Sequence, residues 1–344
     1  MKIHFDTLKG LCNHVFVSLG VPPKDSEIIS DVIAKADLYG FKTHGVSRLA
    51  YYIRRIKDGL QHTFTPFEVL RSKGGTAIVD GGNGMGQIVA YKSMSMAITK
   101  ARKYGVGCVT AKNSSHFGIC SYYSLMAANA GMIGVVFTNA RPAVAPFGGK
   151  QPVLGTNPYS IAMPSLSHPF VIDCATSVIQ RGHVEEWCRS GAKVPKGVSI
   201  PQVESPETLL AMLGNGNAAL TVMAEHKGYG LSVAIEMFCA ALSNGAYLSD
   251  LKGHYEGFNR KPYSLGHFFL AIDPEYFIGI DLFRKKISDI RDELKQSGES
   301  VLVAGDLEFE GIEERKSDIE IDNHVYSELQ NIAAEFEFYL EKEL

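Results

Sequence analysis

Thr43-His44-Gly45-Val46-Ser47-Arg48-Leu49-Ala50-Tyr51-Tyr52 is the stretch of this sequence that most constrains its fold and its chemistry. If the stretch is helical, the spacing of four places His44, Arg48 and Tyr52 on one face. Thr43 is then a suitable N-cap and Gly59 a suitable end. An imidazole, a guanidinium and a phenol on one face suit a small anionic carbonyl compound, because arginine binds a carboxylate through two hydrogen bonds and histidine or tyrosine transfers a proton. A solvated helix face shows the same spacing, so the rest of the chain has to decide.

The composition is that of an ordinary globular protein. The 344 residues are 45% hydrophobic and 21% charged, with a formal net charge of -3, so nothing favours a nucleic-acid or acidic-membrane partner. None of the six cysteines forms a Cys-x-x-Cys pair, and we therefore expect no metal site and no redox dithiol. The first residues lack the apolar run of a signal peptide, and no stretch has the length of a membrane span. We expect a cytoplasmic protein without a membrane partner.

The chain reads as helical at both ends around a mixed α/β middle. Helices are expected up to residue 59 and at 275–296 and 323–342, with residues 190–220 polar and exposed. The middle alternates strands at 77–80, 107–110, 133–138, 160–163, 170–173 and 268–272 with helices at 88–104, 121–129 and 228–242. We predict a helical domain built from residues 1–65 and 275–344, with an α/β domain inserted at 66–274.

Two glycine-rich segments resemble nucleotide-binding loops but do not fit them. Residues 81–86 match no register of Gly-x-Gly-x-x-Gly and are expected to be a tight turn. Residues 214–219 match the Gly/Ala variant, yet they follow a helix-like segment and precede a strand-like one. That order is the reverse of the strand–loop–helix arrangement that the motif requires. Any nucleotide must therefore be bound by a fold other than the doubly wound one.

Four further polar clusters occur in loops or at element ends. His116 lies in a small-residue loop after a strand, where ligands commonly meet side chains. Gly155-Thr156-Asn157-Pro158 can present donors, and Asp173 to Ser177 ends a strand with an acid and two hydroxyls. Lys227 opens an apolar helix beside two glycines, an arrangement that attracts phosphate. Each cluster alone also has a simple structural explanation as a turn, a cap or a solvated residue.

Taken in order, these clusters are similar to one family. Residues 36–40, 43–52, 113–118, 155–158, 173–177 and 227–231 follow its motif order and approximate spacing. The chain resembles the malate/L-lactate dehydrogenase family of non-Rossmann NAD(P)-dependent oxidoreductases from about residue 5 to residue 335. That family includes ureidoglycolate dehydrogenase, 2,3-diketo-L-gulonate reductase, sulfolactate dehydrogenase and reductases of cyclic imino acids.

The resemblance implies hydride transfer between NAD or NADP and a small 2-hydroxy or 2-oxo acid in a homodimer. Arg48 would hold the substrate carboxylate, and His116 would be the general acid/base with His44 hydrogen-bonded to the reacting oxygen. Which of the two histidines carries the proton stays open. Tyr52 and Thr43 would line the pocket. Arg141 is hypothesised to provide a second anion contact, which would favour a dicarboxylate or sulfonated substrate.

The resemblance also implies a set of cofactor contacts. The expected residues are Asn139, Ala140, Thr156, Asn157, Asp173, Cys174, Ala175, Thr176, Ser177, His226, Lys227, Gly305 and Asp306. The late turn reads Ala304-Gly305-Asp306 where the family usually has Pro-Gly-Glu, which weakens the expectation there. Two alternatives remain at this point: a reductase of cyclic imines such as Δ1-piperideine-2-carboxylate, and a non-catalytic relative that binds a nucleotide.

Overall fold

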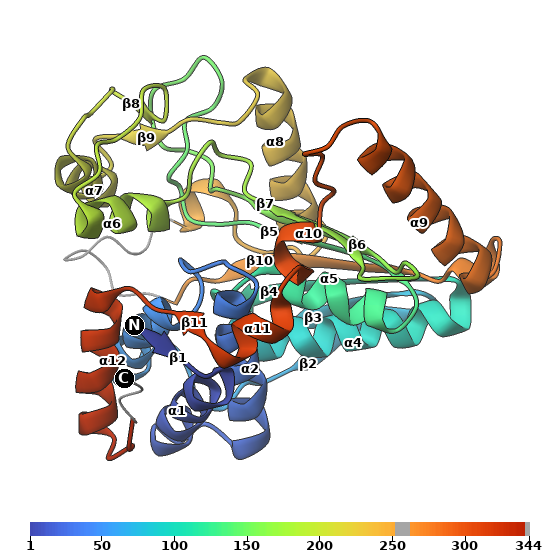
Figure 1. Cartoon of the computed structure of the whole chain (residues 1–344), viewed down its shortest axis with the longest axis horizontal. Coiled ribbons are helices and arrows are strands. Elements are labelled where there is room, and N and C mark those ends of the chain that lie inside the picture. Colours follow the sequence, from blue (N-terminus) through green and yellow to red (C-terminus); the bar gives the residue numbers. More distant parts are fainter. Residues whose placement is uncertain (252–261, 341–344) are drawn as a thin grey trace.

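The computed structural model describes residues 1–251 and 262–340 as a mixed α/β fold (Figure 1). The helices are α1 (Phe5–Ser18), α2 (Pro23–Leu38), α3 (Leu49–Lys57), α4 (Gly86–Tyr104), α5 (Cys120–Asn129), α6 (Arg181–Ser190), α7 (Pro206–Asn215), α8 (His226–Ala240), α9 (Ile280–Gln296), α10 (Asp306–Phe309), α11 (Ile312–Ser317) and α12 (Asn323–Glu335). The strands are β1 (Lys2–Ile3), β2 (Glu68–Lys73), β3 (Thr76–Asp80), β4 (Val106–Ser114), β5 (Ile133–Thr138), β6 (Tyr159–Met163), β7 (Phe170–Cys174), β8 (Ser199–Ile200), β9 (Ala219–Leu220), β10 (Leu265–Ile272) and β11 (Ile319–Glu320).

A seven-stranded sheet in the order β2-β3-β4-β10-β5-β6-β7 forms the centre of the molecule. Among the described strand pairs of this sheet, β3 with β4 is parallel and the others are antiparallel. Helices α4 and α5 pack on the sheet through a core that includes Val79, Val109 and Phe269. A Cβ on Gly107 would lie 1.9 Å from the Ala97 carbonyl oxygen, so glycine there allows α4 to approach the sheet. Helix α8 adds a further apolar cluster around Phe268.

The two ends of the chain share one hydrophobic core. Residues of α1, α2 and α3 pack with Ile319, Ile321 and the apolar face of α12, and β1 pairs with β11. Helix α9 lies outside that core: of its residues only Arg291 is buried. Figure 1 shows α9 beside the sheet, away from α1 and α12. The predicted domain boundaries at residues 65 and 275 stay a prediction.

A small lobe next to the sheet corrects one expectation. The sequence pattern predicts that residues 190–220 are polar and exposed, yet they contain α7, β8 and β9. Their apolar residues Val194, Leu209 and Leu220 join Val184 of α6 in a separate core. Many of these residues are exposed as expected, but the apolar positions are buried, because they gather in one core when α6 and α7 pack together. The helix-then-strand order around Gly216 is confirmed, since α7 ends there and β9 follows.

The helix expected from Thr43 begins later than its sequence suggests. A short 3-10 helix covers Val46–Arg48 and α3 starts only at Leu49, while Gly59 ends the segment as expected with φ +68°. Thr43 and His44 lie in the turn before it and do not cap the helix. The predicted C-terminal helix is also shorter, since α12 ends at Glu335.

Two negative findings apply to the described residues. No helix among them combines the length and apolar character needed to cross a membrane. Residues 1–251 and 262–340 also hold no group of histidine, cysteine and carboxylate side chains that could bind a metal ion.

Candidate active site

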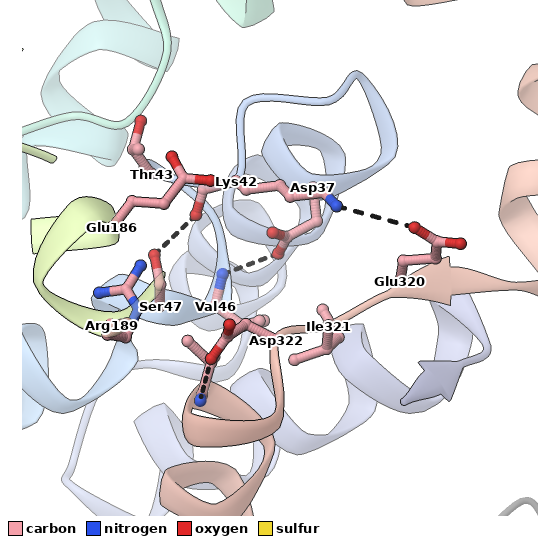
Figure 2. Close-up of a pocket in the computed structure, with 11 residues that line it drawn as sticks. Asp37, Lys42, Thr43, Val46, Ser47, Glu186, Arg189, Glu320, Ile321 and Asp322 are labelled. Carbon is pink, nitrogen blue, oxygen red and sulfur yellow. Dashed lines mark hydrogen bonds and ion pairs between the residues drawn. The ribbon is translucent and has the colours of Figure 1, made fainter. Parts of the chain in front are cut away.

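A buried carboxylate shapes the turn that carries His44. Asp37, in the last turn of α2, accepts the Val46 N–H at 2.7 Å, as Figure 2 shows. A Cβ on Gly45 would lie 2.1 Å from the same carboxyl group, so only glycine allows this close approach. Asp37 therefore accepts the N–H that the Thr43 side chain would accept if Thr43 were the N-cap of the helix. A cavity of about 40 Å³ lies beside this turn, facing α6.

His44, Tyr52 and His116 meet in one cluster, although they come from a turn, a helix and a distant loop. The rings of His44 and His116 stack with centroids 5.5 Å apart and an interplanar angle of 19°. The Tyr52 hydroxyl lies 2.6 Å from Nδ1 of His116. The Thr43 hydroxyl lies 2.9 Å from Nδ1 of His44. The structure thus brings together the two histidines, Tyr52 and Thr43, four of the residues predicted to contact the substrate.

The environment keeps both imidazoles neutral at pH 7. Burial, with the charge of Arg48 and the nearby His183, lowers the pKa of His44 to about 3. Burial is also the largest cause for His116, whose pKa is held well below its ordinary value, with His44, Arg48 and Arg141 adding to the effect. Burial raises the pKa of Tyr52, so its hydroxyl stays protonated. Each ring nitrogen of the stacked pair can therefore be a donor or an acceptor according to tautomer.

Arg48 is oriented from two sides. Its Nε donates to the Thr43 carbonyl oxygen at 2.7 Å, and its NH1 lies 3.0 Å from Oε2 of Glu185 on α6. Helix α6 approaches so closely that a Cβ on Gly182 would lie 3.0 Å from NH2 of Arg48. The Arg48 side chain is 21% exposed, and its guanidinium lies between the turn and the small lobe.

Arg141 reaches the same cluster through aromatic rings. Its guanidinium carbon lies 4.8 Å from the ring centroid of Tyr263, and that of Arg55 lies 3.7 Å from the same centroid. The Tyr263 hydroxyl is hydrogen-bonded to that of Tyr51, whose ring packs edge-on against His116 at 6.4 Å. The predicted substrate residue Arg141 is therefore close enough to lower the pKa of His116.

Several residues of this site were not predicted. Tyr51, Tyr263, His183 and Glu185 carry no motif that separates them from structural residues. His183 accepts the Gln180 N–H at 3.4 Å at the start of α6 and acts electrostatically on His44. The one available signal was the position of Tyr51 next to Tyr52 in the opening stretch. The contribution of α6 depends on the packing of the small lobe, which no local pattern reveals.

On the cofactor side, two predicted asparagines are bound to protein partners. Asn139 and Asn157 are fully buried, and their amide nitrogens donate to Glu236 of α8 at 3.3 and 2.9 Å. The Asn157 Oδ1 accepts the Ala140 N–H at 3.0 Å, and the Asn139 Oδ1 accepts the Gly266 N–H at 2.8 Å. These side chains fix the loops at 139–140 and 155–157 beside one another. Any contact of the two amides with a cofactor stays a prediction.

The strand end at 173–177 adjoins those loops. Asp173 is partly buried and accepts the Ser121 N–H at the start of α5 at 2.6 Å. Burial raises the pKa of Asp173 to about 6. The Thr176 hydroxyl and N–H both donate to the Thr156 carbonyl at 2.9 Å. The Ser177 hydroxyl donates to the backbone at 2.6 Å, Ala175 is buried and Cys174 is half-buried.

The helix start at residues 226–227 lies near this edge. The Met223 N–H donates to the Thr176 carbonyl at 2.9 Å, which ties the turn before α8 to the strand end. His226 and Lys227 are exposed at the first positions of this 15-residue helix. A cation at a helix N-terminus is an arrangement that favours a phosphate group.

Gly305 and Asp306 have a structural explanation. The Asp306 side chain is fully buried and binds Arg291 at 2.7 Å, Lys295 at 2.8 Å and His168 at 3.2 Å. Gly305 has φ +104°, and a Cβ there would lie 2.6 Å from the Pro169 carbonyl oxygen. Both carboxylate oxygens of Asp306 are thus occupied by protein partners, and the predicted cofactor contact of this turn stays a prediction.

Comparison with known proteins gives the family. The sequence pattern of the malate/L-lactate dehydrogenase family matches residues 3–330. The chain belongs to the malate/L-lactate dehydrogenase family. The resemblance inferred from the motifs is therefore confirmed, and the chain is an oxidoreductase of the dehydrogenase class.

Relatives from archaea and a eukaryote support this membership. A malate dehydrogenase of Pyrococcus horikoshii is 39% identical, over 97% of this chain and 95% of the relative. An L-sulfolactate dehydrogenase of Methanocaldococcus jannaschii is 38% identical, over 97% and 96%. The crystal structure of malate dehydrogenase from Entamoeba histolytica superposes with a TM-score of 0.94 at 33% identity, covering 99% of both chains. Membership in this dehydrogenase family implies a nicotinamide cofactor.

Proposed function

We propose that this protein interconverts a small 2-hydroxy acid and its 2-oxo acid with NAD or NADP. The observation that carries the proposal is the cluster of His44, Arg48, Tyr52 and His116 beside Arg141. It combines an anion-binding guanidinium with a hydrogen-bonded imidazole within one partly buried site. Relatives named malate dehydrogenase and sulfolactate dehydrogenase support the same class of substrate.

In this proposal Arg48 holds the substrate carboxylate and His116 carries the proton. The carboxylate contact fixes the carbonyl carbon relative to the nicotinamide, which supplies or accepts the hydride when bound. His116 gives a proton to the oxygen that becomes the hydroxyl, and in the reverse direction takes it back. The Tyr52 hydroxyl can accept from Nδ1–H of the charged ring or donate to Nδ1 of the neutral ring, so it serves both states. His44, stacked on His116, hydrogen-bonds the reacting oxygen.

The charge of a bound substrate would change the pKa of His116, the proposed proton carrier. Burial is the main reason for the low pKa of His116, and the cations Arg48 and Arg141 lower it further. A bound carboxylate would offset part of that positive charge and raise the pKa of His116 in the complex. We therefore expect the group seen in the pH profile of kcat to titrate at higher pH than the group seen in kcat/KM.

The residues on the cofactor side fit a dinucleotide. Lys227 and the N-terminus of α8 offer positive charge to a diphosphate, and Asp173 offers a carboxylate to a ribose hydroxyl. We infer that the loops at 139–140, 155–157 and 173–177 hold the cofactor mainly through backbone groups. The mostly antiparallel sheet supports the proposed non-Rossmann arrangement, because a doubly wound domain has a mostly parallel one.

A second anion contact would come from Arg141. A 2-oxo acid with a distal carboxylate or sulfonate would place that group beside the Arg141 guanidinium, near Tyr263. We therefore propose a preference for dianionic over monoanionic substrates. Arg141→Met should reduce this preference by about 10-fold or more, the value of one charge-assisted hydrogen bond. Unchanged selectivity in that variant, with Arg189→Met as the control, would remove Arg141 from the substrate site.

We also propose a homodimer. Helix α8 exposes Met237 and Phe238, and α9 exposes Leu282, Ile290 and Leu294. Such apolar patches on a helix surface commonly mark contacts with another chain. Light scattering coupled to gel filtration should give twice the mass of the chain, and the mass of a monomer at micromolar concentration would contradict the proposal.

One assay tests the proposed reaction. The purified protein is mixed with NADH or NADPH and a panel of monoanionic, dianionic and sulfonated 2-oxo acids and cyclic imines, and nicotinamide absorbance is followed. Oxidation of the cofactor with 2-oxo acids supports the proposal, and the panel identifies the cofactor and substrate class. Turnover confined to cyclic imines would replace the proposed substrate. Absence of turnover with every member would contradict the proposed reaction.

A further inference from the structure

The arginine predicted to bind the substrate, Arg48, already forms an ion pair with a carboxylate of the protein itself. Glu185 Oε2 lies 3.0 Å from NH1 of Arg48, and the two side chains are 25% and 21% exposed. The pair joins α6 of the small lobe to the Thr43–Arg48 turn of the helical core. Charge-assisted hydrogen bonds of this kind are among the stronger polar contacts in proteins. A substrate carboxylate entering the site therefore meets an arginine that already has an anionic partner.

Each edge of the Arg48 guanidinium has one nitrogen that is already paired with a protein acceptor. A carboxylate binds arginine through two nitrogens, either Nε with one terminal nitrogen or the two terminal nitrogens together. Nε already donates to the Thr43 carbonyl, and NH1 already pairs with Glu185. A two-pronged substrate contact therefore uses at least one nitrogen that already contacts the Thr43 carbonyl or Glu185, so the substrate carboxylate competes with that acceptor. The Thr43 carbonyl is fixed in the turn, whereas Glu185 is a flexible side chain in contact with solvent.

Glu185 has a second cation within reach. Oε1 of its carboxylate lies 3.2 Å from Nε of Arg181, one turn earlier on α6. Arg181 is 37% exposed, and both residues belong to the same helix. The Glu185 carboxylate can therefore leave Arg48 and keep its ion pair with Arg181. Its displacement then leaves no unpaired carboxylate in the site.

We propose that Glu185 is a resident carboxylate that occupies Arg48 in the empty site, moves to Arg181 when a substrate carboxylate binds, and so sets the affinity for the substrate. This inference rests on the proposed function, in which Arg48 binds that carboxylate. It makes Glu185 a determinant of KM and not of the chemical step, because its contact is lost before hydride transfer. The apparent affinity equals the intrinsic affinity multiplied by the fraction of enzyme in which Arg48 is free.

The alternative is that Glu185 only orients Arg48 for the substrate. The two roles predict opposite signs for Glu185→Gln, which removes the charge and keeps the shape. A displaced competitor gives tighter carboxylate binding when its charge is lost. An orienting partner gives weaker binding, because Arg48 then samples more positions. The sign of the change in KM therefore decides between them.

The experiment compares Glu185→Gln with Glu186→Gln, which removes the same charge one residue further along α6. Glu186 is exposed and lines the small cavity beside Lys42 and Thr43 (Figure 2). The readouts are KM and kcat for the 2-oxo acid of the panel with the highest kcat/KM, and the inhibition constant of oxamate. Oxamate is a carboxylate that resembles a 2-oxo acid, and its inhibition is measured with reduced cofactor present. We expect Glu185→Gln to lower KM and the oxamate constant by about 3- to 10-fold, with kcat within about 2-fold of wild type. Glu186→Gln should change each by less than about 2-fold.

A second variant tests the exchange of partners. Arg181→Gln removes the alternative cation, so Glu185 should stay on Arg48 and KM should rise by about 3-fold. In the Glu185→Gln background the same change should have no effect, because the carboxylate that moves is gone. A double-mutant cycle measures this coupling.

Three results would overturn the inference: an unchanged or raised KM in Glu185→Gln, an equal decrease in Glu186→Gln, or an Arg181→Gln effect that persists without Glu185. These outcomes are separate from failure of the proposed function. If wild-type enzyme turns over no 2-oxo acid and oxamate does not bind in an Arg48-dependent way, the proposed function itself fails. If wild-type turnover is present and Glu185→Gln does not tighten binding, only the role of Glu185 fails.

Discussion

The side chains of Glu236, Asn139 and Asn157 form a network in which each is hydrogen-bonded to another part of the protein. The polar groups around His116, in contrast, keep donors and acceptors available for a ligand. Glu236 accepts from Asn139 at 3.3 Å, from Asn157 at 2.9 Å and from the Leu248 N–H at 3.0 Å, all within a buried network. His116 shares one ring nitrogen with Tyr52 and stacks on His44. Both regions are rich in motif residues, yet the first forms scaffold and only the second is proposed to take part in the chemistry.

The contrast shows why residue type alone does not distinguish residues that bind a ligand from residues that stabilise the fold. A buried amide with all its partners in the protein positions a loop, and its loss is felt as instability. A half-buried imidazole with a lowered pKa is costly to keep and is characteristic of a reacting site. Variants around Glu236 should therefore reduce stability, whereas variants around His116 should reduce activity.

The largest effect is expected at His116, the proposed proton carrier. His116→Ala should lower kcat by about 10²- to 10⁴-fold, the usual contribution of a positioned acid or base. Affinity for the reduced cofactor, measured by its fluorescence on binding, should change little because the Glu236 network is intact. His62→Ala, at an exposed histidine, is the control. A kcat within about 2-fold of wild type in His116→Ala would assign the proton transfer elsewhere, with His44 as the next residue to test.

The carboxylate contact comes next. Arg48→Lys should raise KM for the 2-oxo acid by about 10- to 100-fold, because lysine cannot reproduce a two-pronged hydrogen bond. Thermal stability should remain near that of wild type, since Arg48 itself belongs to none of the hydrophobic cores. Arg189→Lys on the exposed face of α6 provides the comparison for a surface arginine. Equal KM values in wild type and Arg48→Lys would show that the substrate carboxylate binds another group.

The scaffold region should respond in the opposite way. Glu236→Gln replaces an acceptor of three donors by an amide whose NH2 group faces one of them. A buried donor without a partner costs about 1–3 kcal/mol, so the urea midpoint should fall clearly. The KM for cofactor should rise with it, while the ratio of kcat values for different 2-oxo acids should stay the same. If stability were unchanged and only catalysis failed, Glu236 would belong to the chemical half of the site.

The smallest effect is a pH dependence at the turn. Burial raises the pKa of Asp37 to about 7, so the folded protein keeps a proton that the unfolded chain releases from about pH 4 upward. The free energy of unfolding of the wild type therefore falls as pH rises toward 7. In Asp37→Asn the side chain does not titrate, so this decrease is absent. The unfolding free energy of the variant relative to wild type should rise by roughly 1–3 kcal/mol between pH 5 and pH 7 and then level off.

Urea titrations at several pH values measure this difference, with Asp6→Asn, at an exposed aspartate, as the control. A difference that is flat with pH, or that falls between pH 5 and pH 7, would show that Asp37 is ionised in the folded protein. The side-chain amide introduced by Asp37→Asn keeps an acceptor for the Val46 N–H, so the turn itself should be retained.

Much of the fold followed from local pattern. Helices α4 and α8 and the short β-branched or aromatic runs of β3, β5 and β10 were predicted in nearly the observed places, because such runs favour one type of element locally. The helix-then-strand order around residues 214–219 was also predicted correctly, since element order is a local property. The start of α3 was misplaced because Asp37, from another helix, takes the Val46 N–H.

The sequence by itself determined the family, the class of reaction and the identity of His44, Arg48, Tyr52 and His116 as candidates, because motif order and residue chemistry are written along the chain. Only the tertiary structure decided that His116 stacks on His44 and bonds Tyr52, that Asn139 and Asn157 are bound to Glu236, and that Glu185 pairs with Arg48. These are contacts between elements far apart in sequence. Distances and burial, and with them pKa shifts and the pairing of charges, arise only when the helical core, the sheet and the small lobe pack together.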